Sequence, residues 1–500
     1  FVRVEYTLFA NHPDGTYAGI DASSIHLNGP ATFLWLKNAD KSPIDIKFNL
    51  PAGKSWSIAT QLKPGSDSTL FTARDLQYLM DSPVSIGALH WKEWTQVNPD
   101  KKSYKFRLAL EADAKDSLVE KFAGNIAKIT SQAQAVFGEL PAFDYGTYTF
   151  LSGINPFVRG DGMEHRNSTV INIPIQFTGN SVPSVFAHEF FHAWDVERIR
   201  PKTLEPFNFE KSNMSNELWF AEGFTQYYGE LLLQRCGFRG LEEYTGTLAS
   251  LVNTKENTAG ARRFSPVEVS RHAVFVDAGV SIDKSNYVNM YTSYYPYGAS
   301  IALALDLELY SRYKLNLDVY MQGVWKRFGV KEQPYNVAGL ESVLAEVTKD
   351  KTFAAEFFSK YVNGHEPLNY APLLEKAGLK LIQAGKGIAW LGNFSLKQDL
   401  SLNGPTIIGT PLYEAGLDAD DKIIQLDGKK IASQTDLRNI IEAHKPGDKV
   451  VIQYQHRDNT VTGEIVFSFN PAYTVKTFER ENIELTTEII EFRKQWLGPK

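Results

Sequence analysis

The residues best suited to chemistry in this sequence are two histidines and a glutamate at close spacing. His188, Glu189 and His192 form an H-E-x-x-H pattern within an apolar and aromatic run. On a helix, residues four apart lie on one face, so both imidazoles can reach one metal ion. Glu189 is rotated by about 100° from His188, where its carboxylate can accept a proton from water activated by that ion. The pattern predicts a metal-dependent hydrolase rather than two surface histidines.

A third metal ligand is expected from a second helix, because a catalytic zinc site uses three protein ligands and keeps one position open. Glu222 lies in an apolar and aromatic run of helical character. A carboxylate in such surroundings is costly unless it meets a cation. We therefore predict that His188, His192 and Glu222 bind one Zn²⁺ ion. Glu217 and Glu230 are the alternatives for the third ligand.

Hydrophobic periodicity divides the chain into four regions that must hold these residues. Residues 1–115 have the short alternating runs and turn clusters of a β-sandwich-like domain. Residues 116–375 are mostly helical and contain the predicted metal site. Residues 376–475 return to short strands, and residues 476–500 form a tail with one short helix near Thr487–Leu497. The fold class is therefore multidomain α+β.

Two helices are expected to carry the metal ligands, Ser184–Asp195 and Leu218–Arg235. Alternating or apolar runs predict short strands at Val2–Phe9, Phe33–Leu36, Lys105–Leu110, Thr147–Leu151, Val170–Ile175 and Thr406–Gly409.

Composition excludes several classes of protein. The net charge is −6, from 52 basic and 58 acidic residues, which argues against a nucleic-acid partner. No run of apolar residues is long enough for a membrane span. The one cysteine, Cys236, cannot form an internal disulfide or a cysteine-based zinc site. Because Phe1 begins the sequence without a leader, we expect a trimmed chain, with a bacterial periplasmic or secreted location favoured and a cytoplasmic one as the alternative.

The segment His188–Pro201, HEFFHAWDVERIRP, resembles the signature of the glycyl aminopeptidase-type zinc metallopeptidases. These are gluzincins with a thermolysin-like catalytic domain and a PDZ domain after it. The resemblance covers nearly the whole chain. It implies that His188, His192 and Glu222 are the zinc ligands and that Glu189 is the general base.

The same resemblance implies a site for the amino terminus of the substrate. Gly162, Met163, Glu164 and His165 resemble the G-x-M-E-N strand of the related aminopeptidases, with a histidine in place of the asparagine. In those enzymes the glutamate binds the free α-amine, and a fixed carboxylate is the group that would recognise an ammonium ion. Gly162, Met163 and Glu164 are therefore the expected substrate-binding residues.

A hydrolytic site also needs a donor for the developing oxyanion. The run from Tyr294 to Gly298 resembles the Y-x-K-G segment of the relatives, which implies that Tyr295 is this donor. Tyr297 stands where the relatives have lysine, and Tyr294 is the alternative donor. Arg198 and Arg200 match the signature as well and are expected to have a structural or substrate-facing role.

Partners of the histidine ligands in a second layer are also expected. The candidates are Asp195, Glu197 and Asp306.

The stretch Pro411–Gly428 resembles the corresponding part of bacterial PDZ domains. Leu391–Phe394 is the candidate loop for a peptide carboxylate, beside the helix that contains Arg438. Such a module would bind a peptide or protein C-terminus by strand addition, or would only pack on the catalytic domain.

The predicted function is a zinc aminopeptidase that acts on peptides with a small first residue such as glycine or alanine, a preference that comes from the resemblance. One alternative is a peptide-binding scaffold whose metallopeptidase fold is not catalytic. Another is a zinc endopeptidase, which Glu164 disfavours because it would block longer N-terminal chains.

Overall fold

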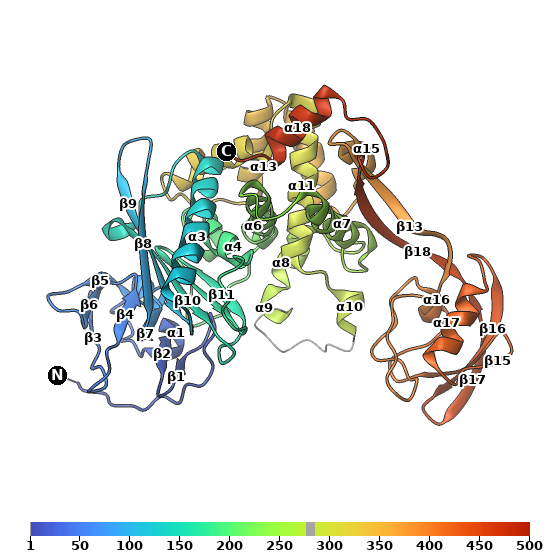
Figure 1. Ribbon diagram of the computed structural model, residues 1–500, viewed down its shortest axis with the longest axis horizontal. Coiled ribbons are helices and arrows are strands. Elements are labelled where there is room, and N and C mark those ends of the chain that lie inside the picture. Colours follow the sequence, from blue (N-terminus) through green and yellow to red (C-terminus); the bar gives the residue numbers. More distant parts are fainter. Residues whose placement is uncertain (1, 277–285) are drawn as a thin grey trace.

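The computed structural model describes residues 2–276 and 286–500, and its regions follow one another along an arch (Figure 1). A sheet-rich N-terminal region and a C-terminal region of short strands stand on either side of a helical region. This arrangement confirms the predicted α+β fold class. None of the helices in the described ranges has the length and apolar character needed to cross a lipid bilayer.

The N-terminal region contains two small antiparallel sheets with an apolar core between them. The first has the order β1 (Gly19–Ile20), β2 (Ser24–Leu27), β7 (Val84–Gly87) and β4 (Ser57–Thr60). The second has the order β3 (Ile44–Lys47), β6 (Leu70–Ala73) and β5 (Lys63–Pro64). Two short helices, α1 (Gly29–Thr32) and α2 (Leu76–Met80), join this region.

Two strand predictions in this region are wrong. The residues Val2–Phe9 alternate as a strand should, but they form no strand in the structure, and Val2 and Phe9 are 92% and 86% exposed. Phe33–Leu36 is an irregular segment that follows α1 directly. Alternating apolar and polar residues are compatible with a β-strand, but a strand forms only where a neighbouring backbone can hydrogen-bond to it.

A five-stranded sheet joins the first region to the helices. Its order is β11 (Asp161–His165), β12 (Ser168–Ile173), β10 (Thr147–Ile154), β9 (Ser103–Glu111) and β8 (His90–Val97). The long helix α3 (Asp116–Phe137) packs on β8 and shares one apolar core with the sheet. β8 and β9 precede residue 115 in the chain, yet β9 pairs with β10, which follows it, and β8 extends the same sheet by pairing with β9. β11 is an edge strand, with β12 as its only strand neighbour among the described residues.

Helices form the largest part of the core. They are α4 (Val185–Phe191), α5 (Leu218–Ala221), α6 (Gly223–Arg235), α7 (Leu241–Asn257), α8 (Pro266–Arg271), α9 (Ala273–Val276), α10 (Tyr287–Met290), α11 (Tyr294–Tyr313), α12 (Leu317–Val324), α13 (Val337–Thr348), α14 (Lys351–Phe357) and α15 (Tyr370–Glu375). Both metal-ligand helices differ from their predicted bounds. α4 ends just before His192, and Glu222 interrupts the predicted helix between α5 and α6.

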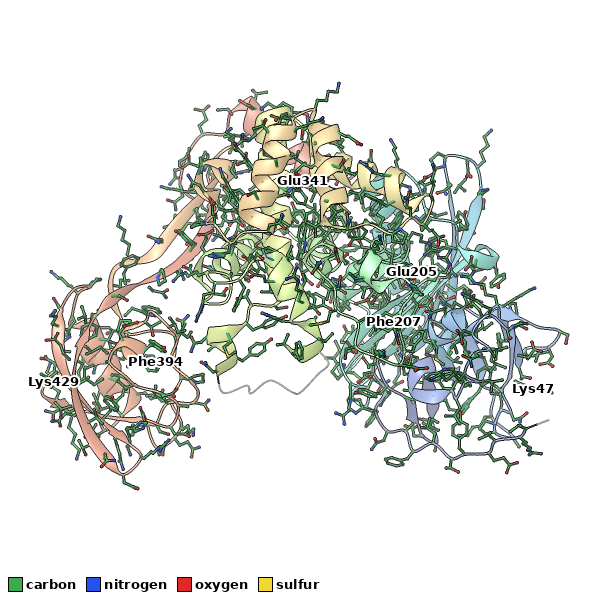
Figure 2. The ribbon with its side chains drawn as sticks, turned by 180° about the vertical axis from the view of Figure 1, so that it is seen from behind. Lys47, Glu205, Phe207, Glu341, Phe394 and Lys429 are labelled. Carbon is green, nitrogen blue, oxygen red and sulfur yellow. The ribbon has the colours of Figure 1, made fainter. Side chains whose placement is uncertain are left out.

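Two long antiparallel strands, β13 (Leu379–Trp390) and β18 (Ser468–Thr477), lead to and from the C-terminal region. Figure 2 shows this arm from behind, with Phe394 and Lys429 marking the region at its end. That region contains a sheet of order β15 (Lys429–Lys430), β14 (Lys422–Leu426), β16 (Lys449–His456) and β17 (Asn459–Val466). Helices α16 (Pro411–Glu414) and α17 (Gln434–Glu442) pack with it around a separate apolar core.

The strand predicted at Thr406–Gly409 is absent, since among these described residues Thr406 and Ile407 are irregular and Ile408 and Gly409 lie in a turn. The backbone of Thr406 and Ile408 bonds to the side chain of Asn289 in the helical region, instead of to another strand.

The chain then returns to the helical region. The helix predicted near Thr487–Leu497 is confirmed as α18 (Thr487–Leu497). Trp496 donates its indole N–H to the hydroxyl of Tyr227 on α6 at 2.8 Å, and the ring of Phe492 stacks on Tyr310 of α11. The C-terminal helix therefore completes the core that contains the predicted metal site.

Candidate active site

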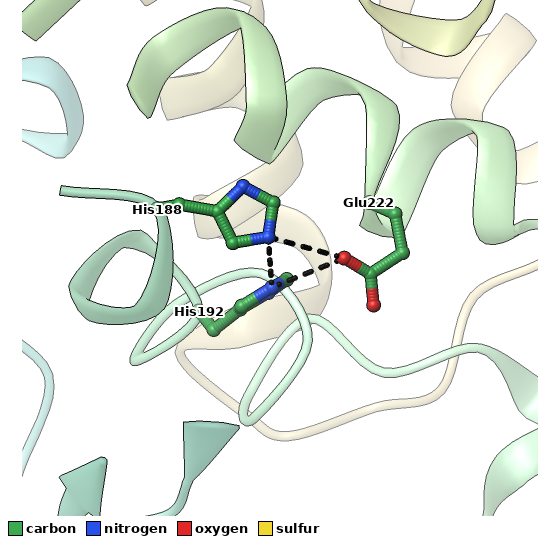
Figure 3. A group of neighbouring side chains, drawn as sticks. All are labelled: His188, His192 and Glu222. Carbon is green, nitrogen blue, oxygen red and sulfur yellow. Dashed lines mark hydrogen bonds and ion pairs between the residues drawn. The ribbon is translucent and has the colours of Figure 1, made fainter. Parts of the chain in front are cut away.

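Three side chains predicted as metal ligands meet at one point in the helical region. His188 lies on α4, His192 caps its C-terminus, and Glu222 lies between α5 and α6. The two Nε2 atoms are 3.1 Å apart, and Glu222 Oε2 is 3.3 Å from His188 Nε2 and 3.2 Å from His192 Nε2. Figure 3 shows the carboxylate facing both imidazoles. The alternatives lie elsewhere: Glu217 bonds to hydroxyls of Ser215 and Thr203, and Glu230 pairs with Arg239.

The geometry of these three atoms fits a tetrahedral zinc ion. Ligands at about 2.0–2.1 Å from zinc in a tetrahedral arrangement are separated by about 3.3 Å, which matches the three measured distances. Nδ1 of His192 donates to the backbone oxygen of Asp195 at 2.5 Å. Because a carbonyl oxygen can only accept, this bond leaves a lone pair on Nε2, directed at the other two ligand atoms.

Electrostatics also favours a cation here. Burial disfavours charge on His192, but the carboxylates of Glu222 and Glu164 outweigh it and raise the pKa of this imidazole well above its usual value. Burial likewise opposes ionisation of Glu222, yet the imidazoles of His192 and His188 lower its pKa. The carboxylates therefore stabilise positive charge at the point where the ligand atoms meet.

Glu189 lies beside this point without joining the three ligands. Its side chain is buried, and burial raises the pKa of its carboxyl group well above the usual value. One carboxylate oxygen of Glu189 lies within 4.8 Å of a ligand atom of His192 and a carboxylate oxygen of Glu164. A carboxylate with a raised pKa next to a metal is suited to accept and return a proton.

Gly162 makes room for this glutamate. A Cβ atom built on Gly162 of β11 would lie 2.2 Å from Oε1 of Glu189 and 2.9 Å from Cγ2 of Val185. The edge strand and the Glu189 carboxylate are therefore in direct contact, and only glycine allows that contact.

We expect Gly162→Ala to lower kcat/KM by about 100-fold, because the added methyl must displace the Glu189 carboxylate and misplacing a reacting group by about 1 Å costs on this order. Zinc content should stay at the wild-type level, since no ligand is touched. Gly160→Ala is the control, because a Cβ there meets only Pro174, at 3.2 Å. Wild-type rates for Gly162→Ala, measured with the same peptide, would show that the position of Glu189 does not matter.

Glu164 projects from the edge strand β11 next to the same cluster. Burial, with the neighbouring carboxylates of Glu222 and Glu197, raises the pKa of Glu164 to about 7. The N-terminal region braces this strand: His165 Nδ1 lies 3.0 Å from Oδ1 of Asp81, and the backbone N–H of Arg166 donates to Oδ2 of Asp81. The sequence could not show this support, because Asp81 is far from the strand in the chain.

Tyr295 lies next to His188. The centre of its ring is 6.0 Å from that of His188, and it stacks on Tyr294 at 4.7 Å. α11 begins at Tyr294, and its first turn crosses α6 so closely that a Cβ on Gly223 would lie 2.3 Å from Cα of Gly298. This crossing fixes the segment that carries Tyr295 next to the residue that follows Glu222.

The two arginines of the signature segment face the protein. Arg198 is 2% exposed and donates to the backbone oxygens of Ala193, Ala142 and Arg166. Arg200 pairs with Glu197 at 2.9 Å. Arg198 therefore holds the end of the metal-binding segment against the turn that follows β11.

Of the predicted partners for the histidines, one bonds to a ligand, and it does so through its backbone. The carbonyl oxygen of Asp195 accepts from His192. Glu197 is used by Arg200, and Asp306 accepts from Tyr227 and from the backbone N–H of Leu317.

A cavity of about 570 Å³ opens beside Tyr295. It is large enough for part of a peptide. Its lining comes from α6, α7, the connection between them and the start of α11: Gln226, Glu230, Arg239, Glu243, Thr247, Ser250, Leu251, Tyr295 and Pro296. Tyr295, whose ring centre lies 6.0 Å from that of His188, is part of this lining. No local pattern in the sequence indicates this cavity, because segments that are separate in the chain form it.

Comparisons with known proteins identify the families that the three regions resemble. Residues 181–301 match the M61 glycyl aminopeptidase model, residues 1–88 match the peptidase M61 N-terminal domain, and residues 406–466 match a PDZ domain. No curated protein matches the chain.

Solved structures resemble the chain over different lengths. The crystal structure of an aminopeptidase N family protein from Idiomarina loihiensis is 25% identical, covers 98% of this chain and 85% of that chain, and has a TM-score of 0.79. The M1 zinc metallopeptidase from Deinococcus radiodurans is 16% identical over 71% of this chain and 73% of that chain, with a TM-score of 0.48. Native yeast LTA4 hydrolase is 15% identical over 71% of this chain and 53% of that chain, with a TM-score of 0.47.

Together, the family matches and the fold show that the chain has three types of domain. The chain contains an M61 N-terminal domain, an M61 glycyl aminopeptidase domain and a C-terminal PDZ domain, and it is a zinc metallopeptidase.

Proposed function

We propose that this M61-type metallopeptidase is a zinc-dependent aminopeptidase that removes single residues from the amino terminus of peptides. The observation that carries the proposal is one cluster. His188, His192 and Glu222 can hold a metal ion, and the carboxylates of Glu189 and Glu164 lie beside them. The described residues offer one group of two imidazoles and a carboxylate, so we propose one zinc ion per chain.

The residues divide the work of hydrolysis between them. When bound, zinc would polarise the scissile carbonyl group and make water acidic enough to lose a proton near neutral pH. Glu189 accepts that proton and returns it to the leaving amine. The hydroxyl of Tyr295 donates to the carbonyl oxygen as negative charge develops on it. Tyr294, which is 3% exposed and stacked behind Tyr295, is less accessible for this role.

Glu164 binds the free amino group of the substrate. As the edge of its sheet, β11 can align a peptide by backbone hydrogen bonds, and Gly162 and Met163 line that edge beside Glu164. A peptide held by its amine at Glu164, with its first carbonyl at the metal, extends towards Tyr295 and the 570 Å³ cavity. The cavity therefore receives the residues on the carboxyl side of the bond that is cut. The preference for a small first residue, glycine or alanine, is proposed from the M61 resemblance.

The test compares glycyl and alanyl peptides with a leucyl peptide, each with a free and an N-acetylated amino terminus. We expect the wild-type enzyme to cut the free glycyl and alanyl peptides fastest and the acetylated ones about 10- to 100-fold more slowly, because a charged hydrogen bond contributes about 1.5–3 kcal/mol. Glu164→Gln should lower kcat/KM for the free peptides by about the same factor and leave the slow acetylated rates unchanged.

Glu111→Gln serves as the control, because Glu111 is a half-buried carboxylate at the end of β9 in the same sheet and belongs to neither acidic group at the site. If the wild-type enzyme cuts acetylated and free peptides equally well, it is an endopeptidase and Glu164 is not an amine anchor.

The PDZ domain is proposed to bind a peptide or protein C-terminus. Leu391–Phe394, the candidate carboxylate loop, follows β13 directly, and Gly392 has a φ of 129°, which favours glycine. Backbone N–H groups in such a loop can receive a carboxylate.

A further inference from the structure

One buried side chain ties the PDZ domain to the segment that leads to Tyr295. Asn289 of α10 is 2% exposed. Its Nδ2 donates to the backbone oxygen of Thr406 at 2.8 Å, and its Oδ1 accepts from the backbone N–H of Ile408, also at 2.8 Å. A further bond from Nδ2 reaches Oδ1 of Asn286 at 2.9 Å. Both ends of the amide are therefore satisfied, two of the bonds by the PDZ domain.

The PDZ side of this contact is internally braced. Thr406 is 4% exposed, and its hydroxyl donates to the backbone oxygen of Leu417 at 2.5 Å. The backbone N–H and the hydroxyl of Thr410 both donate to the oxygen of Ile407, at 3.0 and 2.7 Å. These bonds within the PDZ domain therefore fix the turn that contacts Asn289.

In the helical region, the segment between Asn289 and Tyr295 is tightly packed. Thr292 lies between them, is 5% exposed, and shares a 2.8 Å hydroxyl hydrogen bond with Thr258. A Cβ on Gly260 would lie 2.6 Å from the backbone nitrogen of Thr292, so the two backbones are in close contact. The hydroxyl of Ser293 then caps α11 at the N–H of Tyr295. A shift at Asn289 is therefore passed along a packed segment to Tyr295.

We propose that Asn289 is a positioning residue for catalysis: the PDZ turn at residues 406–408 holds α10 through it and thereby sets the place of the Tyr295 hydroxyl next to the metal site. This inference rests on the proposed role of Tyr295 as oxyanion donor. The PDZ domain would then help to position a residue of the active site, in addition to any role in binding peptides.

A matched residue makes the test specific. Asn253 of α7 makes a similar pair of backbone bonds to strand β18 of the arm: its Nδ2 donates to the oxygen of Tyr473 and its Oδ1 accepts from the N–H of Tyr473, both at 2.8 Å. Asn253→Ala removes a similar attachment between the helical region and the arm, but Asn253 lies on α7 and not on the segment from Asn289 to Tyr295.

The experiment measures kcat and KM for Asn289→Ala, Tyr295→Phe, the double variant and Asn253→Ala, with the full chain loaded with zinc and an alanyl peptide. We expect Tyr295→Phe to lower kcat by about 100-fold and Asn289→Ala to lower kcat by about tenfold, with KM changed less than about twofold. In the Tyr295→Phe background, Asn289→Ala should lower kcat by less than about twofold, because its effect acts through the missing hydroxyl. Asn253→Ala should keep wild-type kcat.

Asn289→Asp is the second variant in case the alanine variant does not fold, since it keeps the side-chain volume and the bond from Ile408. It must show the same dependence on Tyr295. If Asn289 variants lose kcat equally in both backgrounds, or if Asn253→Ala loses as much, Asn289 is only an attachment point and the inference fails alone. If Tyr295→Phe keeps wild-type kcat, the role of Tyr295 in the proposed function fails first, and this inference fails with it.

Discussion

Glu189→Gln should retain zinc and lose at least about 1,000-fold in kcat. The substitution keeps the size of the side chain and its contact with Gly162, but an amide cannot accept the proton of the attacking water or return it to the leaving amine. Positioned general acids and bases contribute about 10²–10⁴-fold, and one residue performs both transfers here. The measurements are the steady-state rate on a glycyl or alanyl peptide and the zinc content per chain.

A matched control separates this loss from a general effect of neutralising a buried acid. Glu217 is 2% exposed and lies on the segment before α5, with its carboxylate bonded to Ser215 and Thr203. Glu217→Gln should keep kcat within about threefold of wild type. A Glu189→Gln enzyme with near-normal turnover would show that another group transfers the proton, and the next residue to replace would be Glu164.

The local order of residues was enough to predict helices, because their hydrophobic period appears within the segment itself. The helical period around His188 and in Thr487–Leu497 predicted helices that the structure contains, because the apolar face of a helix is visible in its own sequence. The brevity of α4 was not visible. Beyond His192 the chain turns, and the carbonyl of Asp195 comes back to bond the imidazole.

Contacts between segments far apart in the chain could not be predicted from local sequence patterns. Nothing in the sequence around Gly162 shows that Glu189 lies against it, and nothing around His165 points to Asp81. Val2–Phe9 shows the reverse case, since its alternation is clear and its partner is missing from the described residues. Each of these features depends on the energy of a long-range contact, which the local order of residues does not encode.

The metal site was predictable in part for the same reason. The pair His188 and His192 lies on one turn of one helix, so its spacing alone brings the two imidazoles together. Glu222 comes from a separate segment, and its choice over Glu217 and Glu230 rested on apolar surroundings and on family resemblance. In the structure, Glu217 accepts a hydrogen bond from the hydroxyl of Ser215, and Glu230 forms an ion pair with Arg239. The Glu222 carboxylate instead faces both imidazoles.

Glu222→Gln should therefore remove the metal rather than the proton transfer. The amide is a weak, neutral ligand, and two imidazoles alone do not complete the set of three that a catalytic zinc site uses. We expect less than about 0.1 zinc per chain after dialysis and a fall in kcat/KM of at least about 1,000-fold. Because a ligand that binds only the folded state stabilises it by about 4 kcal/mol at 1,000 times its Kd, added zinc should raise the melting temperature of the wild-type chain and leave that of Glu222→Gln unchanged. Glu230→Gln, on the same helix α6 and paired with Arg239, is the control and should bind zinc as the wild type does. Zinc bound to Glu222→Gln at the wild-type level would mean that the third ligand is another residue.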